Sequence, residues 1–196
     1  MKPQILKIDV FSSVYPPAED TFLLLDSIDI RPGDRVIEVG TGTGYVALHL
    51  CQIVDNVIAV DSQHAAVRNT IANARNNALD HKLTVVQSDL LTALNPKEKF
   101  SVIAFNPPYL PEEDSGTTLD HALIGGEQGT EATERFIRHA VEYLQPEGRL
   151  YIVVSSLADV IAIEEVMKSC SFVTEIVGET PLFYEKIQIL RGTLKK

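Results

Sequence analysis

The segment Asn106-Pro107-Pro108-Tyr109 combines residue types that could orient a poorly nucleophilic nitrogen. A planar NH2 group conjugated to a carbonyl or a ring is a weak nucleophile because its lone pair is delocalised. The side-chain oxygen of Asn106 and the carbonyl oxygen of Pro107 could accept both of its hydrogens, and the ring of Tyr109 could stack on a flat group. The prolines would stiffen the loop. The segment therefore predicts catalysis by orientation, although the same four residues in isolation could be an ordinary turn.

A glycine-rich loop lies upstream, in Glu38-Val39-Gly40-Thr41-Gly42-Thr43-Gly44. Glycines at alternate positions let the backbone turn tightly and approach a ligand. The dinucleotide fingerprint GxGxxG wraps a pyrophosphate, which an acid facing the loop would repel. In the ExGxGxG pattern found here, the acid could instead hold the ammonium group of a methionine moiety. The loop favours S-adenosylmethionine as the cofactor, and a nicotinamide cofactor or a purely structural turn are the alternatives.

Two further acids each follow an apolar, strand-like run. Asp61 comes directly after Val57–Val60, where a carboxylate could accept both ribose hydroxyls of an adenosine. Asp89 follows Leu83–Gln87 after one intervening residue and could accept from the adenine amino group while Leu90 packs against the ring. The plainer alternatives are a helix cap for Asp61 and an exposed loop aspartate for Asp89.

Alternating strands and helices would position these segments. The sequence predicts strands at 35–39, 57–60, 83–87, 102–105, 150–154, 172–177 and 183–190, helices at 45–53, 63–78, 131–144 and 158–169, and turns at 31–34 and 145–148. Another helix starts near Glu19, where acidic residues suit a first turn. Apolar, β-branched strands separated by helices indicate a parallel sheet covered on both faces. We expect one α/β domain over residues 1–196, with its ligands beyond the carboxyl ends of the strands.

The charge argues against naked nucleic acid as a substrate. The chain has 17 basic and 27 acidic residues, which gives a formal net charge of −10. A protein that binds a nucleic-acid backbone needs a positive surface. A protein substrate with a basic surface would be attracted instead.

Composition also indicates whether the protein binds a metal and where in the cell it is found. The two cysteines, Cys51 and Cys170, lie far apart, and the histidines form no ligand cluster, so we predict no metal. The longest apolar runs are far too short to span a membrane, and residues 1–4 lack the pattern of a signal peptide. We therefore expect a cytoplasmic protein without a membrane partner.

Taken together, these motifs resemble the HemK-related class I methyltransferases. The similarity is to the short eukaryotic and archaeal branch that modifies the glutamine of the GGQ motif in translation termination factors. It rests on Tyr15-x-Pro17-Ala18-Glu19-Asp20-Thr21-Phe22, on 38–44, on 106–109 and on Gly125-Gly126-x-x-Gly129. The resemblance implies a Rossmann-like, mostly parallel seven-stranded sheet with an antiparallel last strand, in which residues 1–33 pack on the cofactor site.

The resemblance also implies roles for individual residues. Cofactor contacts would come from Thr21, Glu38, Gly40, Asp61, Asp89, Leu90 and Asn106. Residues Asn106 to Tyr109 would hold the substrate glutamine, beside the loop that contains Gly125 and Gly126. The branch usually has a Trp before this Gly-Gly pair and an Arg after the following Gly, where this chain has Leu123 and Thr130. The substrate is therefore less firmly implied than the cofactor.

Members of the branch typically act with a small zinc-binding activator subunit that adds a strand beside the third strand. Leu83-Thr84-Val85-Val86 would suit such an edge, but an ordinary edge strand without a partner would have the same kind of sequence.

The leading hypothesis is thus a protein glutamine N5-methyltransferase that acts on a release factor. The alternatives are a nucleic-acid amino-methyltransferase, since an exocyclic amine fits the same acceptors, a non-catalytic S-adenosylmethionine-binding partner protein and, least favoured, a nicotinamide-dependent reductase.

Overall fold

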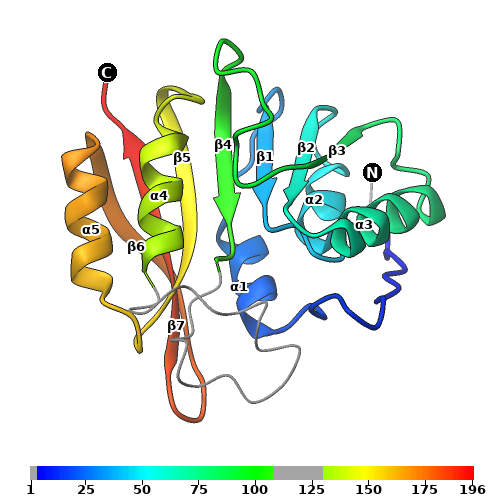
Figure 1. Ribbon diagram of the computed structural model, residues 1–196, viewed down its shortest axis with the longest axis horizontal. Coiled ribbons are helices and arrows are strands. Elements are labelled where there is room, and N and C mark those ends of the chain that lie inside the picture. Colours follow the sequence, from blue (N-terminus) through cyan, green and yellow to red (C-terminus); the bar gives the residue numbers. More distant parts are fainter. Residues whose placement is uncertain (1–3, 108–129) are drawn as a thin grey trace.

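The computed structural model describes residues 4–107 and 130–196, and seven strands in these ranges form one sheet. The strands are β1 (Val36–Val39), β2 (Val57–Asp61), β3 (Leu83–Gln87), β4 (Phe100–Phe105), β5 (Leu144–Ser155), β6 (Phe172–Pro181) and β7 (Lys186–Leu194). They lie in the order β3-β2-β1-β4-β5-β7-β6, and only the pairs that involve β7 are antiparallel (Figure 1). The predicted mostly parallel sheet is confirmed.

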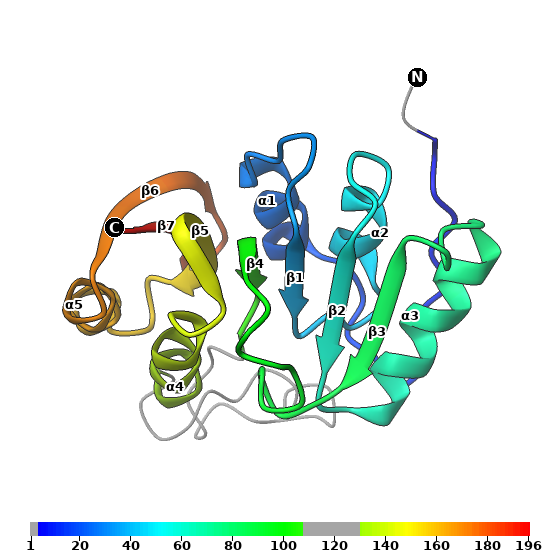
Figure 2. The same ribbon diagram turned by 90° about the horizontal axis from the view of Figure 1, so that it is seen from above.

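Helices cover both faces of the sheet. They are α1 (Glu19–Ser27), α2 (Tyr45–Leu50), α3 (His64–Asn76), α4 (Glu131–Ala140) and α5 (Val160–Ser169). Figure 2 shows α1 and α2 on one face and α4 and α5 on the other. None of the helices in the described ranges is long and apolar enough to cross a membrane.

The apolar core has two layers, one on each side of the sheet. Strand β1 shows how the sequence builds them: Val36 belongs to the layer that includes residues of α1 and α2, whereas Ile37 belongs to the layer that includes residues of α4 and α5. Alternate residues of a strand point to opposite faces, so a strand buried on both faces is apolar throughout. Glu38 breaks this rule in β1 and is nevertheless buried. This exception makes Glu38 a candidate functional residue.

The strand order reverses at β1, which pairs with β2 on one side and with β4 on the other. The loops after β1 and β4 therefore leave the same edge of the sheet. In α/β sheets, ligands bind at this point, beyond the carboxyl ends of the strands. The topology thus brings the glycine-rich loop and Asn106 to one place.

Several sequence-based boundaries were wrong by a few residues, among them the end of the helix predicted at 131–144, which stops at Ala140, and two further differences are informative. The turn predicted at 145–148 falls within β5, where the register with β4 shifts and Glu147 adopts φ 64°. It is a bulge that keeps the strand paired on both sides of the irregularity. The last strand begins at Lys186 rather than Phe183, because Phe183 and Tyr184 form the exposed turn of the β6–β7 hairpin. Aromatic residues favour strands in general, and here they occupy a hairpin tip.

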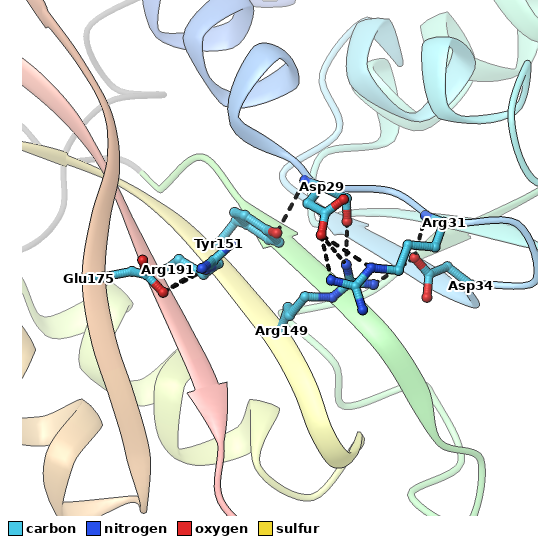
Figure 3. Close-up of polar contacts among 7 residues, drawn as sticks. All are labelled: Asp29, Arg31, Asp34, Arg149, Tyr151, Glu175 and Arg191. Atoms are coloured by element: carbon cyan, nitrogen blue, oxygen red, sulfur yellow. Dashed lines mark hydrogen bonds and ion pairs between the residues drawn. The ribbon is translucent and has the colours of Figure 1, made fainter.

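A buried arginine joins the segment after α1 to the sheet at the edge opposite the site. Arg149 of β5 donates to Asp34 Oδ2 at 2.6 Å and to Asp29 Oδ2 at 3.2 Å, and Asp29 N–H donates to the Tyr151 hydroxyl (Figure 3). The side chains of Arg149 and Asp34 are 8% and 10% exposed, whereas that of Arg31, which also pairs with Asp29, is 66% exposed. Arg149 therefore forms a buried ion pair with Asp34, whereas Arg31 forms an exposed one with Asp29.

Replacing the buried arginine should cost far more stability than replacing the exposed one. Arg149→Leu leaves the buried Asp34 carboxylate without its partner, so we expect a loss of about 3 kcal/mol in the free energy of unfolding. The matched control, Arg31→Ala, should cost less than about 1 kcal/mol because solvent screens its pair. Urea unfolding of both variants checks this, and equal losses would contradict it.

Candidate active site

A cavity of about 280 Å³ lies at the carboxyl edge of the sheet. Its walls come from the ends of β1 to β4, from α4 and from residues 13–24 at the amino-terminal side. Residues predicted from the sequence line it: Thr21, Glu38, Gly40, Gly42, Asp61, Asp89, Leu90, Asn106 and Pro107. The structure thus brings these residues together from distant parts of the chain, and their contacts with a cofactor stay a prediction.

The glycine-rich loop has the conformation that its composition predicts. Gly40, Gly42 and Gly44 have φ values of 69°, 55° and 81°, which side chains rarely tolerate. A Cβ at Gly40 would come within 3.1 Å of the Asn106 carbonyl oxygen, so this glycine also lets the two loops approach. Gly44 was predicted with the cofactor residues but is not among those that line the cavity. A Cβ there would lie 2.8 Å from the Thr70 methyl group, so packing against α3 explains it.

Glu38 holds the glycine-rich loop against the start of α2. Its Oε2 accepts from the Thr41 hydroxyl at 2.7 Å and from the Ala47 N–H at 3.0 Å. Burial raises the pKa of Glu38 to about 8, against the opposing effect of these two donors. A cation in the cavity would favour the ionised carboxylate.

Asp61 is not the cap of α3, whose N-cap is Gln63, so that prediction was wrong, but Asp61 lines the cavity. Its Oδ1 accepts from the Gln63 N–H at 2.9 Å, at the entry to α3, and its Oδ2 accepts from the Gly42 N–H at 3.0 Å. Burial raises the pKa of Asp61. The carboxylate therefore joins the loops after β1 and β2, and its remaining acceptor capacity is available to a ligand.

Asp89 has a partner that the sequence did not reveal. Arg135 of α4 donates to Asp89 Oδ1 at 2.8 Å, and both side chains are more than half exposed. Arg135 also lines the cavity. Leu90, next to Asp89, is buried and has φ 50°. The ion pair joins α4 to the loop after β3 and closes this end of the cavity.

Asn106 is held by a residue of α1. Its Nδ2 donates to Asp20 Oδ2 at 3.0 Å. Its Oδ1 is buried and has no hydrogen-bond partner in the described part of the chain. A buried acceptor without a partner is costly, and such atoms are rare in folded proteins. Asn106 thus brings to the wall of the cavity a side-chain acceptor that no described residue satisfies.

Two asparagines of α3 and the asparagine that caps its C-terminus hold the amino-terminal segment in place. The Oδ1 atoms of Asn69, Asn73 and Asn77 accept from the N–H groups of residues 11, 9 and 7 at 2.8–3.0 Å. Their side-chain amides also donate to backbone carbonyls of residues 9 and 7. This asparagine ladder positions residues 13–17 on the cavity. Asparagines spaced by four residues on a predicted helix were a visible signal, because that spacing aligns them on one face.

Part of the predicted substrate site lies outside the described residues. This applies to Pro108, Tyr109, Gly125 and Gly126, and to the departure at Leu123. Thr130, the other departure, is buried at the start of α4.

The chain is similar to known methyltransferases over most of its length. The methyltransferase small domain model matches residues 9–180. A putative protein N5-glutamine methyltransferase of Methanocaldococcus jannaschii is 33% identical over 192 residues, 95% of each chain. Methyltransferase HEMK2 of Homo sapiens is 34% identical over 156 residues, 73% of this chain and 72% of its own. Among solved structures, the E. cuniculi Mtq2–Trm112 complex, described as responsible for methylation of the eRF1 translation termination factor, matches with a TM-score of 0.71 at 24% identity and covers 93% of this chain and 99% of the other.

The buried Glu38 should make stability depend on pH. Its folded-state pKa of about 8 lies above the ordinary value of 4.5, so between these pH values the folded state retains a proton that the unfolded chain has lost. The free energy of unfolding therefore falls with rising pH, by up to about 1.4 kcal/mol per pH unit from this group. Glu38→Gln should gain stability relative to the wild type from about pH 5 to pH 8. Denaturant unfolding across this range tests it, and a difference that does not vary with pH would contradict it.

Proposed function

Because this chain belongs to the methyltransferase small domain family, we propose that it transfers a methyl group from S-adenosylmethionine to the side-chain amide nitrogen of a glutamine. The observation that carries this proposal is the buried, unpartnered Oδ1 of Asn106 at the cavity. Together with the neighbouring carbonyl oxygen of Pro107, it forms a pair of acceptors suited to a planar NH2 group. The names of the two relatives given above support the same chemistry.

The residues around the cavity fit S-adenosylmethionine. Gly40 and Gly42 of the glycine-rich loop bring the backbone to the cavity wall, and Glu38 and Asp61 are acids that burial makes receptive to positive charge or to donors. In the proposed arrangement, Glu38 faces the ammonium group, Asp61 accepts from the ribose, and Asp89 and Leu90 border the adenine. When bound, the cofactor supplies an electrophilic methyl group on a positively charged sulfur.

The protein's own contribution is orientation. An amide nitrogen attacks only when its lone pair points at the methyl carbon, and two acceptors that take both N–H hydrogens fix that direction. The acceptors also stabilise the positive charge that develops on nitrogen as the N–C bond forms and the methyl–sulfur bond breaks. The nitrogen would then release one proton to water. This chemistry needs no strong base within the site.

We propose that the glutamine belongs to the GGQ motif of a translation release factor, in the cytoplasm where translation occurs. The named activity of the Mtq2–Trm112 complex concerns a termination factor, and the present chain shares its fold. The net charge of −10 favours a basic protein surface over a nucleic-acid backbone. A small zinc-binding subunit is the proposed partner, because β3 lies at the edge of the sheet and, among the described strands, pairs with β2 alone. A strand added by the partner would bond to the backbone groups on the outer side of β3.

A methyl-transfer assay tests the substrate directly. With labelled S-adenosylmethionine, and with and without the zinc-binding subunit, we expect label on a GGQ-containing release factor. The matched control is the same factor with its GGQ glutamine changed to asparagine, whose side chain is too short to reach the acceptors. Label confined to RNA or DNA would overturn the glutamine assignment in favour of an amino group of a base, and no transfer to any substrate would support a non-catalytic role.

The surface beside the cavity offers a contact for a protein substrate. Phe183 and Tyr184 are 91% and 87% exposed. Their rings form an edge-to-face pair with centroids 4.8 Å apart. The tip of their hairpin projects beyond the carboxyl ends of the strands (Figure 1). Glu185, next to them, accepts from Ser155 and is close enough to Tyr15 at the cavity to raise its pKa. Exposed, rigid aromatic residues are typical anchors of protein interfaces.

Removing this aromatic pair should weaken recognition of an intact factor only. The double substitution Phe183→Ser and Tyr184→Ser should raise KM for the release factor about tenfold, the effect of losing about 1.4 kcal/mol of contact energy. KM for a short GGQ peptide, which cannot reach the hairpin tip, should stay unchanged. Val173→Thr, an exposed apolar position at the other end of β6, is the control. An equal change in KM for the factor and for the peptide would show that the aromatic pair does not contact the intact factor.

A further inference from the structure

We propose that Asp20 is a positioning residue that sets the direction of the Asn106 side-chain amide. This inference rests on the proposed function and deepens it. Asp20 lies in the first turn of α1, 86 residues from Asn106 in sequence, and is 3% exposed. It is not among the residues that line the cavity. Asp20 therefore acts on the reaction through Asn106 and not by touching the substrate.

The chemistry of the pair admits one orientation of the amide. A carboxylate only accepts hydrogen bonds, so it must face the NH2 end of Asn106, whose Nδ2 lies 3.0 Å from Asp20 Oδ2. The two ends of an asparagine amide have nearly the same shape, and a carboxylate partner distinguishes them. Because Nδ2 turns away from the cavity toward Asp20, Oδ1 is left as the buried, unpartnered atom. The pair thus presents an acceptor, and never a donor, to the substrate nitrogen.

Asp20 is itself fixed by its neighbours. Its Oδ1 accepts from the Thr21 N–H at 2.6 Å and from the Thr21 hydroxyl at 3.1 Å. Burial raises the pKa of Tyr15, and so do the nearby charges of Asp20 and Glu19 and a hydrogen bond with Asp20. The Tyr15 hydroxyl therefore keeps its proton and remains a donor. The amino-terminal end of a helix also favours negative charge. Donors on several sides therefore hold the carboxylate in the geometry that Asn106 requires.

A purely structural role for Asp20 predicts a different response to substitution. Asp20→Asn keeps the size of the side chain and one oxygen that can accept from Thr21, so a helix-capping role would survive it. For the amide direction, however, the substitution is disruptive. A carboxamide at position 20 can donate to Asn106 Oδ1, which would turn the Asn106 NH2 group toward the substrate nitrogen. Two donors would then face each other.

The decisive experiment exchanges the two side chains. Asp20→Asn alone should lower kcat for release-factor methylation at least about 100-fold, in the range seen when one prepositioned transition-state contact is lost. Asn106→Asp alone should do the same, because two carboxylates would meet about 3 Å apart, as the present atoms do. In the double variant, the carboxamide at position 20 donates to the carboxylate at position 106, whose other oxygen again faces the substrate. We expect kcat of the double variant to recover to within about tenfold of the wild type.

Three readouts separate positioning from folding. Affinity for S-adenosylmethionine by calorimetry and the melting temperature should change little in Asp20→Asn, while kcat falls and KM does not. Glu19→Gln, an exposed acid in the same helical turn, is the control and should leave all of them unchanged. A normal kcat in Asp20→Asn would overturn the inference, as would a double variant no more active than the product of the two single losses. A wild type that methylates no glutamine would overturn the proposed function. An active wild type whose kcat is unchanged by Asp20→Asn would overturn only the role of Asp20.

Discussion

The pairing of β1 with β4 at the centre of the sheet is the constraint on which the site depends. These strands are far apart in sequence but run in register, with Val39 opposite Phe105. Their loops leave the same edge, so the glycine-rich loop and Asn106 meet there. The contact is close enough that a Cβ at Gly40 would lie 3.1 Å from the Asn106 carbonyl oxygen. A side chain at that position would therefore push the loops after β1 and β4 apart.

Around this centre, polar side chains hold the segments that wall the cavity in place. The asparagine ladder of α3 holds the amino-terminal segment, Asp20 of α1 holds Asn106, and Arg135 of α4 holds Asp89. A single such bond contributes only about 1 kcal/mol to stability, but each specifies one geometry. The walls come from segments that meet only in the folded state. The site therefore exists only when both faces of the sheet are covered.

Buried acids give this edge its electrostatic character. Glu38 and Asp61 satisfy backbone donors of the loops, yet burial still raises the pKa of both. Their environment therefore favours a ligand that brings positive charge or hydrogen-bond donors. S-adenosylmethionine has an ammonium group, a sulfonium centre and ribose hydroxyls, and so offers all of these. The acidity of the whole chain adds a weaker, longer-range preference for basic partners.

The sequence by itself determined the sheet and the identity of the main polar residues of the cavity. Apolar runs specify β1 and β4, alternate glycines specify the loop between β1 and α2, and polar residues after each strand mark the ligand edge, because these are properties of local chemistry. Only the tertiary structure decided the partners. The link between Asp20 and Asn106 spans 86 residues, and Arg135 meets Asp89 only because α4 packs beside the loop after β3. Gly44 likewise owes its place to Thr70 of α3. Spacing along the chain reveals which side chains can do chemistry, whereas their orientation depends on contacts between segments that the sequence keeps apart.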